Sequence, residues 1–317
     1  MSTNENRNSL LLFQNPFATM RLGDNMNALL VLMADILLAV NMVVQKKYQA
    51  SEGAGMKPGF KFNALGGLAA AVIFFCISGF KLEFSVFSLM CATVMSICTL
   101  MYTLLGFRIL RDGNTALYSV FLMSGGMLLP YVFGIFVLDE TVTVLRIIGI
   151  VVMLIAVFLS ANVKMQFTPK LILLCIAVFV FNGCVSIISK VHQINTAYSP
   201  VSSSAFVMYA NLIKSIFSGV ALLFLKNKTT AESTRKGWFA DNKMLFVIFL
   251  SAAVSGLSYL FQLVGAKELP ASVLYPLVTG GTIVLSALAG KLFCKEKLST
   301  SGIVSVALCL VGTLLFL

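Results

Sequence analysis

Ten apolar blocks, each close to the length of helix that crosses a bilayer, follow one another along this sequence. A helix needs roughly 20 residues to cross about 30 Å of hydrocarbon. Short polar or Gly/Pro-containing breaks separate the blocks, which predicts an all-α membrane protein with about ten transmembrane helices. The breaks around Asp139 and between the last two blocks are only a few residues long, so nine helices is the alternative. The blocks cover residues 26–45, 62–80, 84–106, 114–137, 142–161, 169–190, 203–225, 243–265, 270–290 and 298–317.

The composition argues against a soluble enzyme. Of the 317 residues, 59% are hydrophobic and only 11% are charged, whereas soluble domains carry about 25% charged residues. The net charge of +11 does not indicate nucleic-acid binding, because the basic residues lie in short connections and form no stripe. The seven cysteines form no CxxC pair, and no phosphate-loop, zinc-protease or nucleophile-elbow motif is present. We therefore expect no enzyme activity, no cofactor and no bound metal.

Basic residues are unevenly divided between the two sides of the predicted bundle. Most of them lie in the connections after the first, third, fifth, seventh and ninth blocks. Because cytoplasmic loops carry an excess of Lys and Arg, this places those connections in the cytoplasm and both termini outside. A polar tail, residues 1–25, would then be translocated, and Met26 is an alternative start. We expect an integral protein of a bacterial plasma membrane, and the sequence specifies no oligomeric state.

An internal repeat divides the chain into two halves. Residues 114–161 align without gaps on residues 270–317, and the matches include Gly125 with Gly281, Gly134 with Gly290, and Glu140 with Glu296. This predicts two five-helix repeats, residues 26–163 and 164–317. Since five is odd, the repeats would lie in opposite orientations, as in many secondary transporters. A Glu at a helix end usually caps the next helix, which is the role we expect for both glutamates.

The end of the chain resembles the closing helices of the drug/metabolite transporter superfamily, especially its EamA and small multidrug resistance branches. The segment reads PASVLYPLVTGGTIVLSALAGKLFCKEKLSTSGIVSVALCLVGTLLFL, and Gly290, Glu296 and Gly312 mark the shared pattern. The first half echoes it as LYSVFLMSGGMLLPYVFGIFVLDETVTVLRIIG. The resemblance implies a ten-helix secondary carrier for small metabolites, amino acids or drugs, without an ATP-binding module. Small multidrug resistance proteins carry a proton-exchanging Glu in their first helix, where this sequence has Leu38.

Two ionisable residues lie near the middle of predicted helices, Asp35 and Lys214. Ionisable groups inside the hydrocarbon are costly, so each is a candidate for function. Asp35 lies about one helical turn from Leu38 and would bind and release protons, or form a structural pair with Lys214. Lys214 would balance the charge of Asp35 or of an anionic substrate. Our hypothesis is that both side chains face a cavity between the two halves.

Polar and aromatic residues inside the predicted helices are further candidates for a substrate-binding wall. The alternative is hydrogen bonding between helices, which is worth only about 0.6 kcal/mol per bond on average. Asn41 and Asn182 occupy similar places in the first helix of each half. The set comprises Asn41, Asn63, Asn182, Asn211, Tyr102, Tyr118, Tyr259, Gln262 and Tyr275.

Proline and paired glycines recur in the fourth helix of each half. Such residues either permit bending during gating or allow close packing of helices. They are Pro130, Gly125 and Gly126 in the first half, and Pro276, Gly280 and Gly281 in the second.

Together these features predict a secondary transporter that works by alternating access, with the lipid bilayer, a small-molecule substrate and protons as its partners. An intramembrane enzyme is one alternative, although no His or Cys cluster surrounds Asp35 and Lys214. A channel or a non-transporting membrane protein is the other.

Overall fold

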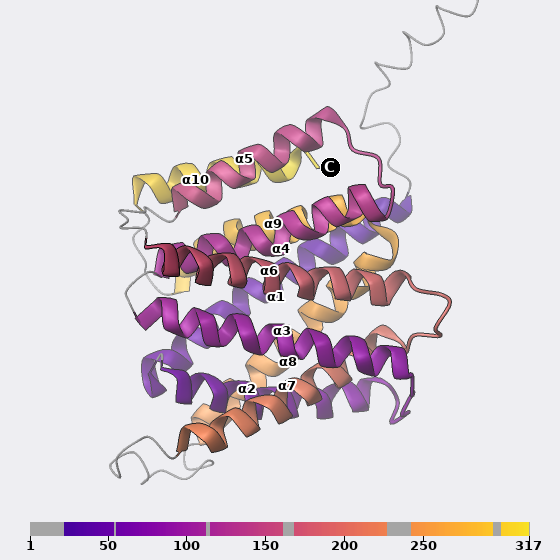
Figure 1. The fold of residues 1–317 in the computed structure, drawn as a ribbon, viewed down its shortest axis with the longest axis vertical. Helices are drawn as coiled ribbons and strands as arrows, with labels where there is room; N and C mark the ends of the chain where they lie inside the picture. The colour runs from indigo at the N-terminus through magenta and orange to yellow at the C-terminus, as the bar shows by residue number, and fades with distance from the viewer. Residues whose placement is uncertain are drawn as a thin grey trace, which may run out of the picture.

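The computed structural model describes residues 22–53, 55–111, 115–160, 168–226, 242–293 and 299–316. Within these ranges the regular structure consists of ten helices (Figure 1). They are α1 (Leu22–Glu52), α2 (Met56–Ile77), α3 (Val86–Arg111), α4 (Thr115–Val137), α5 (Val144–Ser160), α6 (Pro169–Ile194), α7 (Ser203–Lys226), α8 (Asn242–Glu268), α9 (Ala271–Phe293) and α10 (Thr300–Leu314).

Each predicted block corresponds to one helix, so the prediction of ten helices is confirmed. Among the described residues, eight helices are long and apolar enough to cross a membrane. The other two, α5 and α10, have 17 and 15 residues, or about 26 and 23 Å at 1.5 Å per residue. They pack against each other along one side of the bundle (Figure 1).

The first two helices extend beyond the apolar blocks that predicted them. The helix α1 continues to Glu52 instead of ending near residue 45, and α2 begins at Met56 instead of residue 62. The extensions contain Lys46, Lys47 and Lys57. Polar residues form helix as readily as apolar ones, so hydropathy finds where the hydrocarbon ends and not where the helix ends. Residues 1–21 of the predicted tail lie outside the described residues.

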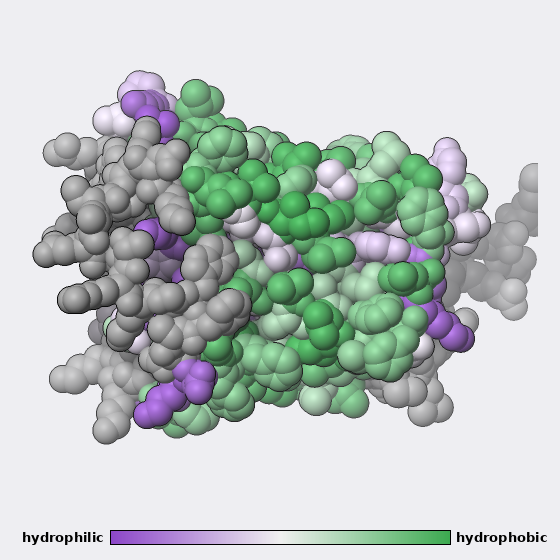
Figure 2. Space-filling model, turned by 90° about the horizontal axis from the view of Figure 1, so that it is seen from below, coloured by the Kyte–Doolittle hydropathy of each residue, from purple (hydrophilic) through white to green (hydrophobic). Residues whose placement is uncertain are grey.

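Successive helices run in opposite directions, so the connections alternate between the two ends of the bundle (Figure 1). We call the end reached by the connections after α1, α3, α5, α7 and α9 the odd end, and the other the even end. Apolar side chains cover the middle of the face seen in Figure 2, and hydrophilic ones gather towards both ends. This belt is the surface that a bilayer would cover, because lipid solvates apolar side chains and water solvates polar ones.

Contacts between the first five and the last five helices are reciprocal. The helix α1 packs on α8 and α9, and α6 packs on α3 and α4. Three further contacts, α2 with α7, α4 with α9 and α5 with α10, pair equivalent helices. If each helix is exchanged for its equivalent in the other half (α1 for α6, α2 for α7, and so on), the same contacts are obtained. Two repeats related by a two-fold axis produce such reciprocity, which supports the proposed division at residue 163.

A glycine on α2 sets the distance between α2 and α7. A Cβ atom at Gly67 would lie only 2.7 Å from the Asn211 carbonyl oxygen of α7. The Ser215 hydroxyl of α7 donates a hydrogen bond of 2.6 Å to the Ala64 carbonyl of α2. In the absence of a side chain at Gly67 the backbones approach closely, as small residues allow in membrane helices.

Replacing Gly67 by Val is expected to destabilise the protein by about 1–3 kcal/mol, because α7 must move away from α2 to admit the side chain. Thermal unfolding of the detergent-solubilised chain measures this loss. Gly219→Ala is the matched control on α7, since nothing lies within 4 Å of a Cβ atom there. An equal stability of both variants would show that Gly67 does not set the helix spacing.

Candidate functional site

The main polar cavity lies between α3, α6, α7 and α8, near the middle of these helices. Its volume is about 190 Å³. Four of the residues that the sequence singled out line it together: Tyr102, Asn211, Lys214 and Tyr259. The rest of the wall comprises Met95, Ser96, Thr99, Val185, Ala210, Ser255 and Gly256. A mid-membrane cavity lined by several convergent polar groups is the typical form of a small-molecule site.

A smaller adjoining cavity shares Lys214 and includes a fifth predicted residue, Asn63 of α2. Its wall also contains Phe60, Thr103 and Phe217. Phe60 lies near the start of α2, whereas Thr103 and Phe217 lie in the later parts of α3 and α7. All of these positions lie towards the odd end. The cavity lining, which includes the polar side chains of Asn63 and Thr103, therefore continues from the middle of the bundle in that direction.

Lys214 is half-buried and is the charged residue that lines both cavities. Within the described ranges, it makes no hydrogen bond or ion pair with the protein. Its neighbour on the same helix, Asn211, is 9% exposed and donates through Nδ2 to the Val207 carbonyl at 2.8 Å. The Asn211 side-chain oxygen therefore remains available as an acceptor.

The opposite wall is fixed by hydrogen bonds around Tyr259. The Tyr259 hydroxyl lies 2.8 Å from the Ser189 hydroxyl of α6 and 3.2 Å from the Met95 sulfur of α3. The Ser96 hydroxyl of α3 donates to the Ala210 carbonyl of α7 at 3.4 Å. These contacts tie three of the four lining helices together and orient the tyrosine next to the cavity.

Asp35 lies elsewhere, between α1 and α9. It is 2% exposed and accepts a hydrogen bond from the Thr282 hydroxyl at 3.2 Å. A Cβ atom at Gly281 would overlap its Oδ2 atom, so the glycine makes room for the carboxylate. Asp35 is absent from the linings of both polar cavities and forms no ion pair with Lys214. The structural pair that was weighed for them is therefore not formed.

The other predicted polar residues are not part of either cavity wall, and all of them except Gln262 make contacts between helices. Asn41 accepts from the Ser251 hydroxyl at 2.5 Å, and Asn182 donates to the Leu122 carbonyl at 2.7 Å. Tyr275 donates to the Ser186 carbonyl at 2.5 Å. Gln262 donates to Ser258 on its own helix at 3.3 Å, and Tyr118 lies where a Cβ atom of Gly106 would be.

The proline and glycine candidates lie inside α4 and α9, where the helices pack closely. A Cβ atom at Gly125 would overlap the Phe179 backbone of α6, and one at Gly280 would overlap the Thr313 hydroxyl of α10. Gly126 lies against Asn182, with 2.7 Å from a Cβ atom to Nδ2. Pro130 and Pro276 occur within the helices without ending them. Close packing accounts for the glycines, and bending at the prolines stays a prediction.

At the even end, hydrogen bonds join the connection after α2 to the connection after α6. The Glu83 carboxylate accepts from the Ser202 amide at 2.5 Å and from the Ser202 hydroxyl at 2.8 Å. The Tyr209 hydroxyl of α7 donates to the Glu83 carbonyl. The two halves of the chain are thus joined across this end by a charged acceptor, and charge-assisted hydrogen bonds are stronger than neutral ones.

A second network at the even end is centred on His192 of α6. Its Nε2 atom lies 2.9 Å from the Ser88 hydroxyl of α3, and its Nδ1 atom lies 2.9 Å from the Gln193 amide. The ring stacks on Phe206 of α7 at a centroid distance of 3.7 Å. His192 lies in the last turn of α6. In the structure, it is 1% exposed and joins three helices.

A third contact at this end holds the connection between α8 and α9. The Lys190 ammonium of α6 donates to the Ala266 carbonyl at 2.7 Å and to the Leu269 carbonyl at 2.6 Å. Glu140 accepts from the backbone amides of Ala271 and Ser272 at 2.6 and 2.8 Å. A cation thus lies at the C-terminus of α8 and an anion at the N-terminus of α9, as helix dipoles favour.

Glu140 was expected to cap the next helix along the chain. It caps a helix start as expected, but the helix is α9 of the other half and not the following α5. Its repeat partner Glu296 lies outside the described residues. Lys190 was missed because the predicted block ended at that residue. The available signal was a basic residue followed by the apolar Val191 and by His192, in a helix that continues to Ile194.

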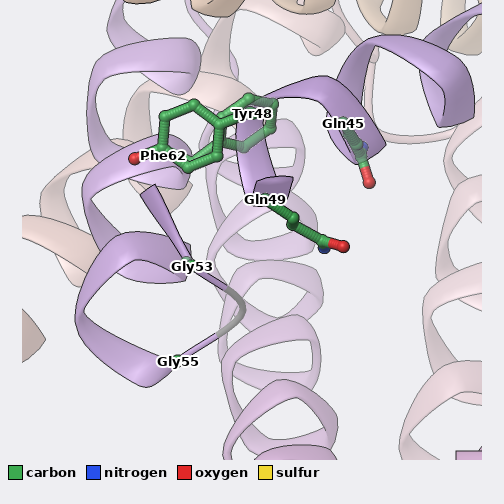
Figure 3. Close-up of a pocket in the computed structure, with 7 residues that line it drawn as sticks. Gln45, Tyr48, Gln49, Gly53, Gly55 and Phe62 are labelled. Carbon is green, nitrogen blue, oxygen red and sulfur yellow. The ribbon is translucent and has the colours of Figure 1, made fainter. Parts of the chain in front are cut away.

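A shallow pocket at the corner between α1 and α2 is a weaker candidate (Figure 3). Its volume is about 60 Å³, and no charged residue is part of its wall. The Tyr48 and Phe62 rings lie side by side with centroids 4.7 Å apart, and the Tyr48 hydroxyl donates to the Pro58 carbonyl at 3.1 Å. These contacts explain the tyrosine as packing at a helix corner.

Comparison with known proteins agrees with this architecture. Residues 169–317 match the EamA-like transporter family, whereas no curated protein matches the chain. Among solved structures, one titled "Crystal structure of protein" superposes on this chain with a TM-score of 0.69 at 16% sequence identity. The superposition covers 92% of this chain and 96% of that one, so the two chains share the fold over most of their length. The resemblance seen in the sequence is therefore confirmed for the second half of the chain, which is similar to the EamA-like transporter family.

Proposed function

We propose that this protein is a secondary active transporter that moves a small solute by alternating access, with the solute bound in the Lys214 cavity. The observation that carries the proposal is a mid-membrane cavity, lined from both halves of the chain, whose Lys214 ammonium has no partner among the residues that the structure describes. A charge inside the hydrocarbon region is costly and usually marks a pathway for a substrate or an ion. The odd end would face the cytoplasm of a bacterial cell, in line with its basic connections.

The asymmetry between the two ends supports an alternating mechanism. Polar lining continues from the cavity towards the odd end, whereas Glu83, His192 and Glu140 each take part in hydrogen bonds that close the even end. If the two repeats exchange conformations, contacts of this kind would break at the even end and close the odd end. The structure would then represent the state in which the cavity communicates with the odd end.

Metabolite profiles of cells with and without this chain identify the solute, and proteoliposomes then test the mechanism. Saturable uptake that is accelerated by unlabelled solute on the opposite side is expected of a carrier. Flux that stays proportional to concentration, without such exchange, would indicate a channel. A chemically altered solute would indicate an enzyme, and absence of flux would contradict transport.

Asp35 is the proposed proton-carrying group of this mechanism, since it is a carboxylate within a membrane-spanning helix. Asp35→Asn should abolish accumulation driven by a pH gradient while leaving solute exchange at equilibrium within about twofold. The reason is that the amide oxygen still accepts from Thr282 but the side chain no longer binds a proton. Gradient-driven uptake and exchange of the profiled solute in proteoliposomes measure the two activities.

Thr282→Val is the control for this experiment, because it removes the hydrogen bond to Asp35 and keeps the carboxylate. Retained gradient-driven accumulation in Asp35→Asn would exclude this residue as the coupling group.

A further inference from the structure

The helices around the Lys214 cavity contain almost no negative charge. No Asp or Glu occurs in α2, α3, α6 or α7, and the one acidic residue of α8 is Glu268 at its last position. Lys214 is the one Asp, Glu, Lys, Arg or His side chain among the residues that line the two polar cavities. The cavity wall therefore has a net positive charge whenever Lys214 is protonated.

Three acidic residues of the described ranges are engaged elsewhere in the molecule. Asp35 accepts from Thr282 between α1 and α9, Glu83 accepts twice from Ser202, and Glu140 caps α9. An ion in a low-dielectric site is stable only when it is paired or well solvated. Among the described residues, the Lys214 ammonium has no counter-charge. A ligand that brings a negative charge supplies it.

From this arrangement we propose that the cavity binds small organic monoanions through their carboxylate group, with the Lys214 ammonium as the anchoring charge. The proposal rests on the proposed transport function and specifies its substrate class. Uncharged polar side chains, among them Asn63, Asn211 and Thr99, surround the cation and can bond to the rest of the ligand. The volume of about 190 Å³ suits a molecule of metabolite size.

A carboxylate fits this wall better than a phosphate ester does. Phosphate sites commonly use Arg clusters or several donors to balance close to two negative charges. The two cavities contain no Arg and a single Lys. One ammonium balances one carboxylate, whereas an organic cation would add a second positive charge to an uncompensated one. The wall therefore selects by charge before it selects by shape.

Binding of a matched series to the purified full chain tests the substrate class. The series consists of lactate, lactamide and 1-amino-2-propanol, together with phenylacetate, phenylacetamide and phenethylamine, at equal ionic strength. Ligand-induced shifts of the melting temperature in detergent are expected to be larger for both acids than for their amides and amines. In Lys214→Met the affinity for the acids should fall about 10- to 100-fold, to the level of the amides, because a charge-assisted contact is lost.

Two further variants make the result specific. Lys214→Arg should retain the preference for acids, since the positive charge is kept. Lys291→Met should also retain it, because Lys291 is an exposed residue of α9 outside both cavities. Equal shifts for acids and amides, no shift for any of them, or a preference that persists in Lys214→Met would each overturn the proposal.

Flux of the same acids in proteoliposomes separates this inference from the transport function. If the acids bind in a Lys214-dependent way but no acid crosses the membrane, the substrate class stands and the transport proposal fails. If neutral or cationic solutes are transported and Lys214→Met leaves their flux unchanged, transport stands and the substrate class fails.

Discussion

Glu140→Ala is expected to lower the stability of the protein by about 3 kcal/mol. The substitution leaves the Ala271 and Ser272 amides at the start of α9 without their acceptor. It also removes an acidic group that acts electrostatically on Lys190. A neutral hydrogen bond between membrane helices is worth only about 0.6 kcal/mol. Here the acceptor is charged, and a hydrogen bond to a charged group is worth about 1.5–3 kcal/mol.

Thermal unfolding in detergent measures the effect of Glu140→Ala, with two variants for comparison. Glu140→Gln keeps an acceptor oxygen but not the charge, so its loss should be intermediate. Asp139→Asn alters the charge of the adjacent exposed residue, whose φ of 52° Asn tolerates, and should be nearly neutral. If Glu140→Ala were as stable as Asp139→Asn, the contact between the two halves would have no energetic role.

The second large effect concerns the even end. Glu83→Ala removes both acceptors of the Ser202 hydrogen bonds, which should shift the balance between the two states by at least about tenfold towards opening at that end. A cysteine placed at Ser96, which lines both polar cavities, reports the shift. In Ser96→Cys alone, a membrane-impermeant thiol reagent should react from the side of the odd end. In the double variant it should react from both sides.

Two comparisons make the labelling specific. The chain with Ser96 intact gives the background from its own cysteines, and Lys81→Ala alters an exposed residue of the connection that contains Glu83. Lys81→Ala should leave the labelling pattern of Ser96→Cys unchanged. Labelling of Ser96→Cys from the even end without the Glu83 substitution would show that the hydrogen bonds do not close that end.

Part of the candidate site followed from residue type and depth along the chain. A lysine near the middle of an apolar block can be recognised from the sequence as a functional candidate, because burying its charge in the membrane is costly. Lys214, Asn211, Tyr102 and Tyr259 were found in this way, and the structure brings them to one cavity. Asp35 was found by the same rule, but the rule does not predict which neighbouring helix a side chain faces. The structure turns it towards Thr282 on α9.

The networks at the even end were not accessible from sequence alone. Glu83, Lys190 and His192 lie at or near helix ends, where charged and polar residues are common and usually solvated. Their partners lie far away along the chain: Ser202 is 119 residues from Glu83, and Ala266 is 76 residues from Lys190. Only the packing of distant helices shows that Glu83 and His192 join the two halves, and that Lys190 joins α6 to the end of α8.

The sequence by itself determined the solvent and the number of helices, and it predicted the division into halves. These properties depend on hydropathy and period along the chain, which can be read residue by residue. The tertiary structure alone decided which polar residues share a cavity and which join helices. Those outcomes depend on the rotation of each helix about its axis and on distant partners, and neither is encoded in any local stretch of residues.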